Sequence, residues 1–398
     1  MNSFNSFRLD RATCIALLLV FAPRAGLAQD ASAARTNAPP RFNPPVYSPD
    51  VHLDRTVTFR VRAPAAREVT VSGEWGSEAK QLTRDDQGIW SVTVGPLEPN
   101  LYGYAFNIDG FRTARTADPG NPNLKPMRSP TTSILDVPGP TPALHDFQAD
   151  VPHGAVCQHW YQSQALDRRR ALNVYTPPGY EKNTRTRYPV LYLFHGSGDK
   201  EATWTALGRA QCISDNLLSQ DKMKPMIIVM TDGHAALPRV TGAVSSNMIA
   251  QNVRDFERDL LTDVMPFVES NYRVRSGSAN RAIVGLSMGG GQSLTIGLNH
   301  PELFAWVGGF SSFIQSPEAA LPTALSDPKG TNRRLKLLWL ACGKEDRLID
   351  EARKLSTLLK DKGIRHEYVE TEGDHSWPVW RRYLADFMPL LFAGKARK

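Results

Sequence analysis

The feature that most constrains the fold of this chain is a serine surrounded by glycines in the segment GLSMGGG, residues 285–291. The segment directly follows the apolar run 281–284, which is typical of a buried strand, and directly precedes a helical pattern at 292–299. A sharp turn from a strand into a helix leaves no room for β-carbons beside its central residue. Ser287 in this G-x-S-x-G pattern is therefore predicted at an exposed nucleophile elbow rather than in a purely structural glycine turn.

The second half of the chain alternates between strand and helix patterns. Strands are predicted at residues 188–194, 226–230, 281–284, 335–342 and 366–371. Helical spacing fills 252–272 and 348–362, and Pro266 predicts a kink or a break in the first of these helices. Near-continuous apolar runs are typical of strands buried on both faces of a parallel sheet. Residues 153–395 are therefore predicted to form an α/β domain with a mostly parallel sheet and flanking helices.

The first half of the chain has a different pattern. Apolar residues alternate with polar ones, and turn signals separate the short runs. The runs lie at 57–61, 69–71, 90–94 and 102–108. This pattern predicts a small all-β sandwich of the immunoglobulin type over 46–116. Eight prolines between positions 119 and 152 predict that 117–152 is a linker without regular structure.

The first 28 residues have the pattern of a secretory signal peptide. Two arginines precede the apolar run 14–22, and small residues lead up to Ala28. The apolar run is too short for a typical membrane span, although an uncleaved anchor is the alternative. We expect cleavage near Ala28, a flexible tether over 29–45, and a secreted or periplasmic protein with no membrane association after cleavage.

The charge of the chain does not point to nucleic acid as a partner. The formal net charge of +7 is a mild excess for 398 residues. The densest basic cluster, residues 168–170, has no interleaved aromatic residues and belongs to no nucleic-acid motif, so we interpret it as a solvated turn.

Cysteine spacing limits the disulfides and metal sites that are expected. If residues 1–28 are removed, Cys157, Cys212 and Cys342 remain, which allows at most one disulfide. Cys342 ends an apolar run and is expected to be buried, so Cys157 and Cys212 are the favoured pair if a bridge exists. No CxxC or HExxH spacing suggests a metal site, and no organic cofactor is expected.

A serine hydroxyl is a good nucleophile only when a base takes its proton and a third group orients that base. In α/β-hydrolases these groups follow the chain order Ser, then Asp or Glu, then His. His375, in the segment GDHSW after the last predicted strand, is the expected base. Asp346 follows the carboxyl end of the strand 335–342 and is the expected acid, with Glu345 and Asp350 as alternatives.

Acyl transfer also needs N–H donors that face the oxyanion. The backbone N–H of Met288, directly after the serine, is one expected donor. The second is expected in the loop HGSGD, residues 195–199, with Ser197 as the first choice and Gly198 as the alternative. His195 in this loop is interpreted as a structural residue.

Together these segments resemble the esterase D type of α/β-hydrolase, most closely carbohydrate esterase family one, which contains feruloyl and acetylxylan esterases. The resemblance covers about residues 155–393. Its segments are YLFHGSGDKEATW (192–204), DLLTDVMPFVESNYRV (259–274), RAIVGLSMGGGQSL (281–294), LACGKEDRLI (340–349) and EGDHSWPVWR (372–381). The resemblance implies a catalytic triad of Ser287, Asp346 and His375, with Met288 and Ser197 as oxyanion donors.

Residues 46–115 resemble, more loosely, the early-set module that precedes many such esterases and is related to family 48 carbohydrate-binding modules. The segments VTFRVRAPAAREVTVSGEW (57–75) and LYGYAFNIDG (101–110) carry this likeness. Four aromatic side chains of the module either stack on sugar rings or form the core of the sandwich. They are Trp75, Trp90, Tyr102 and Tyr104.

The resemblance implies a secreted serine carboxylesterase that removes acyl groups, feruloyl groups first, from plant cell-wall xylan through an acyl-enzyme. Its partner is then an ester-substituted plant polysaccharide or oligosaccharide. Four aromatic residues near the predicted site either line an acyl pocket or pack in the core, namely Trp204, Phe313, Trp377 and Trp380. Acetylxylan esterase and enterochelin-type siderophore esterase are the alternatives. A non-catalytic glycan-binding protein is the alternative of a different class, which the intact Ser, Asp, His order disfavours.

Overall fold

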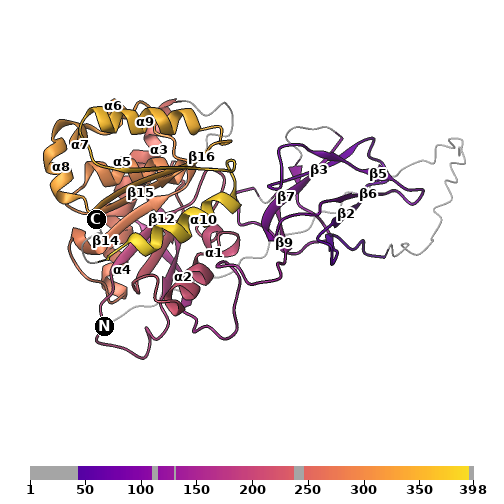
Figure 1. Cartoon of the computed structure of the whole chain (residues 1–398), viewed down its shortest axis with the longest axis horizontal. Coiled ribbons are helices and arrows are strands. Elements are labelled where there is room, and N and C mark those ends of the chain that lie inside the picture. The colour runs from indigo at the N-terminus through magenta and orange to yellow at the C-terminus, as the bar shows by residue number, and fades with distance from the viewer. Residues whose placement is uncertain (1–43, 110–114, 130, 237–245, 394–398) are drawn as a thin grey trace, which may run out of the picture. The chain divides into compact units, whose positions relative to one another are not determined.

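The computed structural model describes residues 44–109, 115–129, 131–236 and 246–393 (Figure 1). The expected signal peptide and its cleavage position at Ala28 therefore lie outside the described residues, as does nearly all of the expected tether. None of the helices in the described ranges is long and apolar enough to cross a membrane.

The first described part of the chain forms two antiparallel sheets, as the alternating pattern predicts. One sheet has the order β1-β2-β6-β5 and the other has the order β4-β3-β7-β8, with β9 added beside β7. The strands are β1 (Asp50–Val51), β2 (Val57–Arg62), β3 (Val69–Gly73), β4 (Lys80–Gln81), β5 (Thr83–Arg84), β6 (Ile89–Val94), β7 (Asn100–Ile108), β8 (Arg115–Thr116) and β9 (Ser133–Val137). Alternate side chains of both sheets, such as Phe59 and Phe106, fill the core between them. We call this part the module.

The structure corrects one expectation for the module and decides between two alternatives for its aromatic residues. Strand β9 lies inside the segment 117–152, which was expected to have no regular structure, and its Leu135 and Val137 complete the core of the module. The aromatic residues also belong to that core, because Trp90, Tyr102 and Tyr104 are buried. Trp75 is partly buried and stacks on Phe59 with ring centroids 5.3 Å apart. These four rings therefore stabilise the sandwich and do not form an exposed surface for sugar stacking.

The second part of the chain forms an eight-stranded sheet in the order β10-β11-β13-β12-β14-β15-β16-β17. Its strands are β10 (Ala155–Ser163), β11 (Arg168–Thr176), β12 (Val190–Phe194), β13 (Ile227–Thr231), β14 (Arg281–Gly285), β15 (Trp306–Phe310), β16 (Leu337–Gly343) and β17 (Glu367–Thr371). The six neighbouring strands β13-β12-β14-β15-β16-β17 pair in parallel. At one edge, β10 pairs antiparallel with β11, and β11 pairs antiparallel with β13. The predicted α/β-hydrolase architecture, with a mostly parallel sheet, is confirmed.

Helices cover both faces of this sheet (Figure 1). The described helices are α1 (Thr203–Ala206), α2 (Ala210–Ser219), α3 (Ser246–Asp259), α4 (Met265–Asn271), α5 (Ser287–Asn299), α6 (Pro317–Ala320), α7 (Pro322–Ser326), α8 (Pro328–Arg334), α9 (Ile349–Asp361) and α10 (Trp377–Phe387). Successive side chains of β12 enter two different hydrophobic clusters, one shared with α2 and α10 and the other with α3, α5 and α9. Burial on both faces explains the near-continuous apolar strands.

The helix predicted over 252–272 is interrupted, as Pro266 indicates. A π-helical turn at Leu260–Val264 separates α3 from α4, and Pro266 stands in the first turn of α4. A proline has no N–H to donate to the preceding turn, so a helix that contains one changes its hydrogen-bonding pattern nearby.

The basic cluster 168–170 is not a solvated turn, which corrects the sequence interpretation. It begins strand β11, and the Arg170 side chain is buried with its Nε 3.0 Å from Oδ2 of Asp259 on α3. The same Asp259 oxygen accepts a hydrogen bond from the Tyr161 hydroxyl at 2.8 Å. The Arg170 guanidinium also donates to the backbone carbonyls of Asp232 and His234. This ion pair therefore holds the loop after β13 against the sheet.

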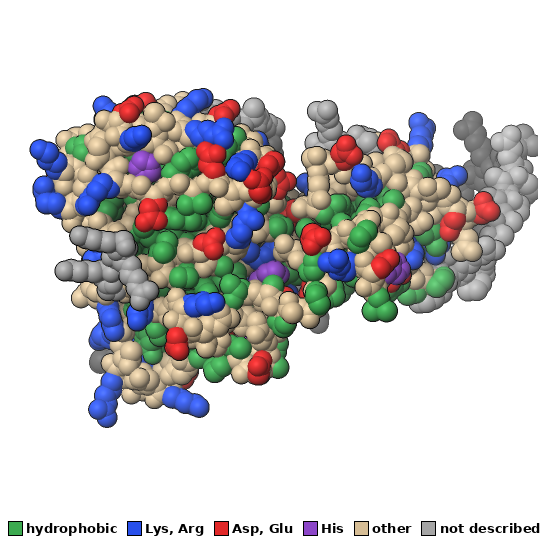
Figure 2. All heavy atoms as spheres, viewed as in Figure 1, with side chains coloured by type: hydrophobic (Ala, Val, Ile, Leu, Met, Phe, Trp, Pro, Cys, Tyr) green, Lys and Arg blue, Asp and Glu red, His purple; other side chains and the backbone are tan. Residues whose placement is uncertain are grey.

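Surface charges are mixed, and the described cysteines form no disulfide. On the face drawn in Figure 2, basic and acidic side chains are interspersed and do not separate into regions of one sign. Cys157 is exposed, Cys212 and Cys342 are buried, and all three are free thiols. The Cys157–Cys212 bridge considered from the sequence is therefore not formed.

Replacing Asp259 with asparagine is expected to lower the free energy of unfolding by about 3 kcal/mol, because the buried Arg170 loses its carboxylate partner. Urea unfolding followed by circular dichroism measures this change. Asp350→Asn is the matched control, since Asp350 is 75% exposed beside Arg353 and such surface pairs contribute less than about 1 kcal/mol. Equal losses in the two variants would contradict the assignment.

Candidate active site

Ser287 begins α5 at the carboxyl end of β14, in the geometry of a nucleophile elbow. Its φ of +51° lies in the left-handed region, which residues with a side chain rarely adopt. A β-carbon added to Gly285 would lie 2.5 Å from the backbone carbon of Gly289, and one added to Gly289 would lie 2.4 Å from the carbonyl oxygen of His195. Glycine at these two positions lets β14, α5 and the loop after β12 approach one another.

Ser287, His375 and Asp346 form a continuous chain of hydrogen bonds. The Ser287 Oγ lies 3.0 Å from His375 Nε2, and His375 Nδ1 lies 2.9 Å from both carboxylate oxygens of Asp346. With the Nδ1 proton donated to the carboxylate, Nε2 is free to accept the proton of the serine hydroxyl. The structure therefore brings together the three residues that the sequence analysis selected.

The acid of this group is Asp346 rather than either alternative. Asp346 is 2% exposed, and although burial alone raises the pKa of its carboxyl group, the hydrogen bond from His375 holds that pKa below its usual value. The Glu345 carboxylate instead accepts a hydrogen bond from the backbone N–H of Gly373. Asp350 faces solvent beside Arg353.

The His375 ring is supported on its other side by Trp380 of α10. The two rings meet edge to face, with centroids 4.8 Å apart and an interplanar angle of 90°. The indole N–H of Trp380 donates to Ser311 Oγ at 3.0 Å, which fixes the indole in turn. A base held on two sides keeps the orientation that proton transfer requires.

The N–H groups of the loop after β12 differ in whether the chain already uses them. The N–H of Gly198 donates to His234 Nε2 at 2.9 Å, so it is already used. The N–H of Ser197 makes no hydrogen bond with any part of the chain that the structure describes. His195 Nδ1 donates to the carbonyl of Gly196 at 2.8 Å, which orients the peptide group that carries the Ser197 N–H. These contacts favour Ser197 over Gly198 as the oxyanion donor in the loop.

The second expected donor, the N–H of Met288, belongs to the first turn of α5. N–H groups in the first turn of a helix have no partner within the helix. The loop after β12 is close to this turn, since a β-carbon added to Gly196 would lie 3.5 Å from Cβ of Ser287. The arrangement can therefore present two N–H groups to an oxygen bonded near Ser287.

Three of the four aromatic residues proposed to line an acyl pocket are buried, which corrects that expectation. Trp204, Trp377 and Trp380 are 1%, 0% and 5% exposed. Trp204 and Trp377 pack edge to face with ring centroids 4.9 Å apart, within the hydrophobic core. Phe313 differs, because it is 37% exposed and its N–H lies 3.5 Å from the carbonyl oxygen of Ser287. Among the four, Phe313 is the one whose side chain is exposed.

Sequence reasoning missed two groups that hold the oxyanion loop. His234 lies in the loop after β13, and its place just after an apolar parallel strand was a signal that could have found it. Lys125, in the expected linker, lies with its Nζ 2.8 Å from Oδ1 of Asp199 in the same loop. Nothing in the local sequence around Lys125 indicates that contact.

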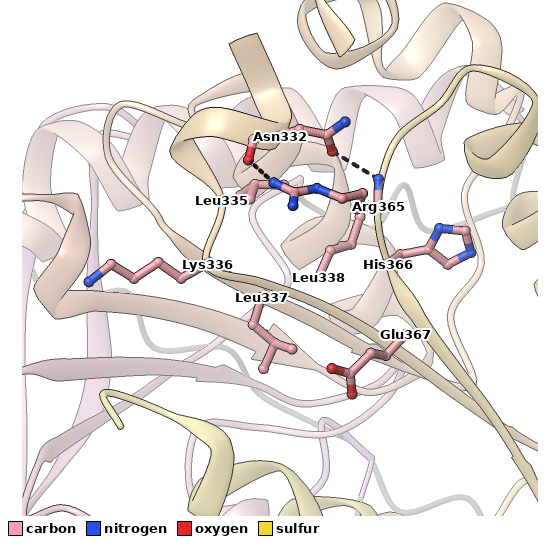
Figure 3. A pocket seen from close by; sticks show the side chains of 8 residues that line it. All are labelled: Asn332, Leu335, Lys336, Leu337, Leu338, Arg365, His366 and Glu367. Atoms are coloured by element: carbon pink, nitrogen blue, oxygen red, sulfur yellow. Dashed lines mark hydrogen bonds between the residues drawn. The ribbon is translucent and has the colours of Figure 1, made fainter. Parts of the chain in front are cut away.

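A pocket of about 210 Å³ lies elsewhere and takes no part in this arrangement (Figure 3). It is lined by Asn332, Leu335, Lys336, Leu337, Leu338, Arg365, His366 and Glu367. These residues lie at or before the starts of β16 and β17, whereas Ser287 and Asp346 follow the ends of parallel strands. Figure 3 shows Arg365 turned toward Asn332, to which it donates two hydrogen bonds. Within the described ranges, no group of His, Cys, Asp and Glu could hold a metal ion.

Comparison with known families agrees with this architecture. The sequence model of a family described as "Putative esterase" matches residues 163–391, more than half of the chain. A second model, described as carbohydrate-binding module 48 (isoamylase N-terminal domain), matches residues 46–120. The two matches confirm the two resemblances inferred from the sequence, and the second ends before β9.

One curated relative and two solved structures illustrate the similarity. An endo-1,4-beta-xylanase/feruloyl esterase from Xylanibacter ruminicola is 32% identical over 360 residues, which are 89% of this chain and 47% of the relative. This chain thus spans about half the length of that relative. A ferulic acid esterase from Anaeromyces mucronatus is 24% identical with a TM-score of 0.55, over 63% of this chain and 94% of the other. The enterobactin esterase from Shigella flexneri is 19% identical with a TM-score of 0.60, over 85% and 93%. The two structures show the shared fold.

The His234 ring is expected to make stability fall as the pH drops from 6.5 toward 4. Burial, and then the charge of His195, hold the pKa of His234 at about 4, below its usual 6.5. Between these values the unfolded chain binds more protons than the folded one. The contribution of His234 to folding stability is therefore fully present above pH 6.5 and is lost as the pH falls toward 4.

The variant His234→Gln keeps an acceptor for the Gly198 N–H but removes this titration. Denaturant unfolding at several pH values should show a pH dependence that is shallower by up to about one proton between pH 4 and 6.5. His52→Gln, which changes an exposed histidine of the module, is the control. Equal slopes in the wild type and His234→Gln would rule out this role of the ring.

Proposed function

This chain belongs to the esterase family that its sequence matches over residues 163–391, and from this premise we propose that it is a serine carboxylesterase acting on plant xylan. The acyl group that it removes is feruloyl. The hydrogen-bonded chain from Ser287 through His375 to Asp346 is the observation that carries the serine mechanism. Membership of the family makes the chain a carboxylic ester hydrolase. The serine mechanism, the acyl group and the polymer are the proposal.

The reaction proceeds through an acyl-enzyme. His375 Nε2 takes the proton of the Ser287 hydroxyl while Oγ attacks the ester carbonyl, and Asp346 stabilises the imidazolium that forms. The N–H groups of Ser197 and Met288 donate to the oxyanion of the tetrahedral intermediate. His375 then gives its proton to the oxygen of the leaving sugar as the ester C–O bond breaks. A water molecule, deprotonated by the same imidazole, attacks the acyl-enzyme, and His375 returns that proton to Ser287 Oγ as the acid is released.

The choice of a feruloyl ester rests on two observations. The Phe313 backbone contacts the backbone of Ser287 and its ring is exposed, and aromatic rings favour stacked or edge-to-face contacts with one another. The Xylanibacter relative, whose name includes both xylanase and feruloyl esterase, aligns with 89% of this chain. A feruloyl group attached to xylan fits both observations.

The site of action is outside the cytoplasm, in the periplasm or beyond it. The support is the sequence of residues 1–28, where arginines precede an apolar run and small residues follow it. Free Cys157, Cys212 and Cys342 are compatible with this location, because a folded secreted protein needs no disulfide when its core is large.

Replacing Ser287 with alanine is expected to lower kcat on methyl ferulate by about 10⁴-fold or more, because the nucleophile is lost while the fold is kept. Labelling by a fluorophosphonate probe should disappear in the same variant. Ser276→Ala, at an exposed serine before β14, is the control and should retain both properties. An unchanged rate in Ser287→Ala removes the serine mechanism.

Phe313 is expected to separate feruloyl from acetyl substrates. In Phe313→Ala, kcat/KM for methyl ferulate should fall about five-fold or more, as loss of one aromatic contact predicts, and the value for p-nitrophenyl acetate should stay within two-fold, about the size of an uninvolved side chain's effect.

The wild type is measured in parallel on methyl ferulate, p-nitrophenyl acetate and acetylated xylan. Acetate release from xylan that is faster than ferulate release would identify an acetylxylan esterase instead. If kcat/KM of Phe313→Ala falls equally for methyl ferulate and p-nitrophenyl acetate, Phe313 does not determine the preference for the acyl group.

A further inference from the structure

We propose that Glu74, a residue of the module, is a positioning residue for the catalytic histidine of the esterase domain. The inference deepens the proposed function and rests on it, because it assigns a role in the same reaction to a residue that is about 300 positions away in the sequence. It makes the module a part of the catalytic unit, in addition to any role in binding glycan.

The Glu74 carboxylate joins the module to the start of α10. Its Oε2 accepts a hydrogen bond from the N–H of Gly103 on β7 at 2.6 Å, and its Oε1 accepts one from the N–H of Trp377 at 3.2 Å. The backbone N–H of Glu74 also donates to the carbonyl of Gly103 at 3.0 Å. The two hydrogen bonds with Gly103 thereby fix Glu74 within the module, and its Oε1 remains for Trp377.

The carboxylate replaces a cap that α10 does not supply itself. Ser376 occupies the N-cap position but makes no side-chain capping hydrogen bond. The N–H of Trp377, the first residue of this 11-residue helix, is satisfied by Glu74 instead. A carboxylate at the positive end of a helix is also favoured electrostatically. Because Trp377 is two residues after His375, the cap fixes the end of the segment that carries the catalytic base.

Packing carries the constraint from Trp377 to the His375 ring. Trp377 is fully buried and meets Trp380 edge to face with centroids 5.5 Å apart. Trp380 in turn meets His375 edge to face at 4.8 Å. Lys125, in the segment that follows β8, lies 5.6 Å from the Trp377 ring. A displacement of α10 would therefore displace the imidazole relative to Ser287.

A second contact with the module lies one turn further along α10. The buried Arg381 guanidinium donates to Oδ1 of Asn100 and to the carbonyl of Leu101, both at 2.5 Å and both on β7. It also donates to the carbonyl of Leu207, in the esterase domain, at 2.7 Å. Arg381 fixes the helix to the module, whereas Glu74 fixes the end of the helix from which the histidine loop emerges.

The environment of Glu74 is consistent with a carboxylate that is held by the fold. Burial raises its pKa, and the positive charge of Lys125 and the hydrogen bonds from Gly103 and Trp377 oppose that rise. Gly103 leaves room for this arrangement, because a β-carbon there would lie 3.1 Å from Oε2 of Glu74.

The test compares Glu74→Ala and Glu74→Gln with the wild type on p-nitrophenyl acetate, a substrate without sugar, so that glycan binding by the module cannot affect the rate. The value of kcat is expressed per serine titrated by a fluorophosphonate probe, so that unfolded molecules are not counted. The matched control is Glu78→Ala, since the Glu78 side chain is 83% exposed in the same module.

We expect Glu74→Ala to lower kcat per titrated serine by about ten-fold or more, with KM within two-fold, because a misplaced base slows proton transfer without removing the substrate site. Glu74→Gln has one acceptor for two N–H donors and should show a smaller loss. Glu78→Ala should match the wild type.

The outcomes separate this inference from the proposed function. A wild type without esterase activity refutes the proposed function. An active wild type with unchanged kcat per titrated serine in Glu74→Ala overturns the inference, even if fewer molecules fold. If Glu74→Ala yields no folded protein, Glu74→Gln decides, and its equality with the wild type overturns the inference.

Discussion

The whole site depends on the parallel pairing of six neighbouring strands, in the order β13-β12-β14-β15-β16-β17. Parallel strands end at the same edge of a sheet, so the segments that follow them meet there. The oxyanion loop follows β12, Ser287 follows β14, Asp346 follows β16 and His375 follows β17. Backbone hydrogen bonds along the strands thus bring Ser287 and His375 together, although they are 88 positions apart.

Pairing brings these loops to one edge, but it does not fix their conformations. Each loop is held by a further polar contact, and these contacts come from different parts of the chain. His234 holds the loop after β12, Arg170 holds the loop that carries His234, and Trp380 supports the imidazole of His375. Glu74 adds a contact from the module. Buried polar groups are costly unless they are paired, so an arrangement of this kind is stable only when every member is present.

The sequence predicts those features that depend on local pattern. The strand before Ser287 could be predicted from periodicity, and the glycines around it from the lack of room for β-carbons. The order Ser287, Asp346, His375 could be predicted from the chain order of α/β-hydrolases. The assignment of Arg170 to a solvated turn was wrong, since its buried partner Asp259 is 89 positions away and leaves no trace in the local pattern. The burial of Trp204 and Trp377 could not be predicted either, because a tryptophan has the same local sequence pattern whether its indole faces a cavity or the core. The contacts of Glu74 and Arg381 between the module and α10 are also absent from the local sequence pattern.

The crowding of backbone around Gly285 and Gly289 also has an evolutionary side. Every missense change at these two codons adds a β-carbon within about 2.5 Å of another backbone atom, so we expect such alleles to be lost. Phe313, three residues beyond the end of β15 and partly open to solvent, is under no such restriction. We therefore expect new ester specificities in descendants of this gene to arise in the surrounding loops rather than at the elbow.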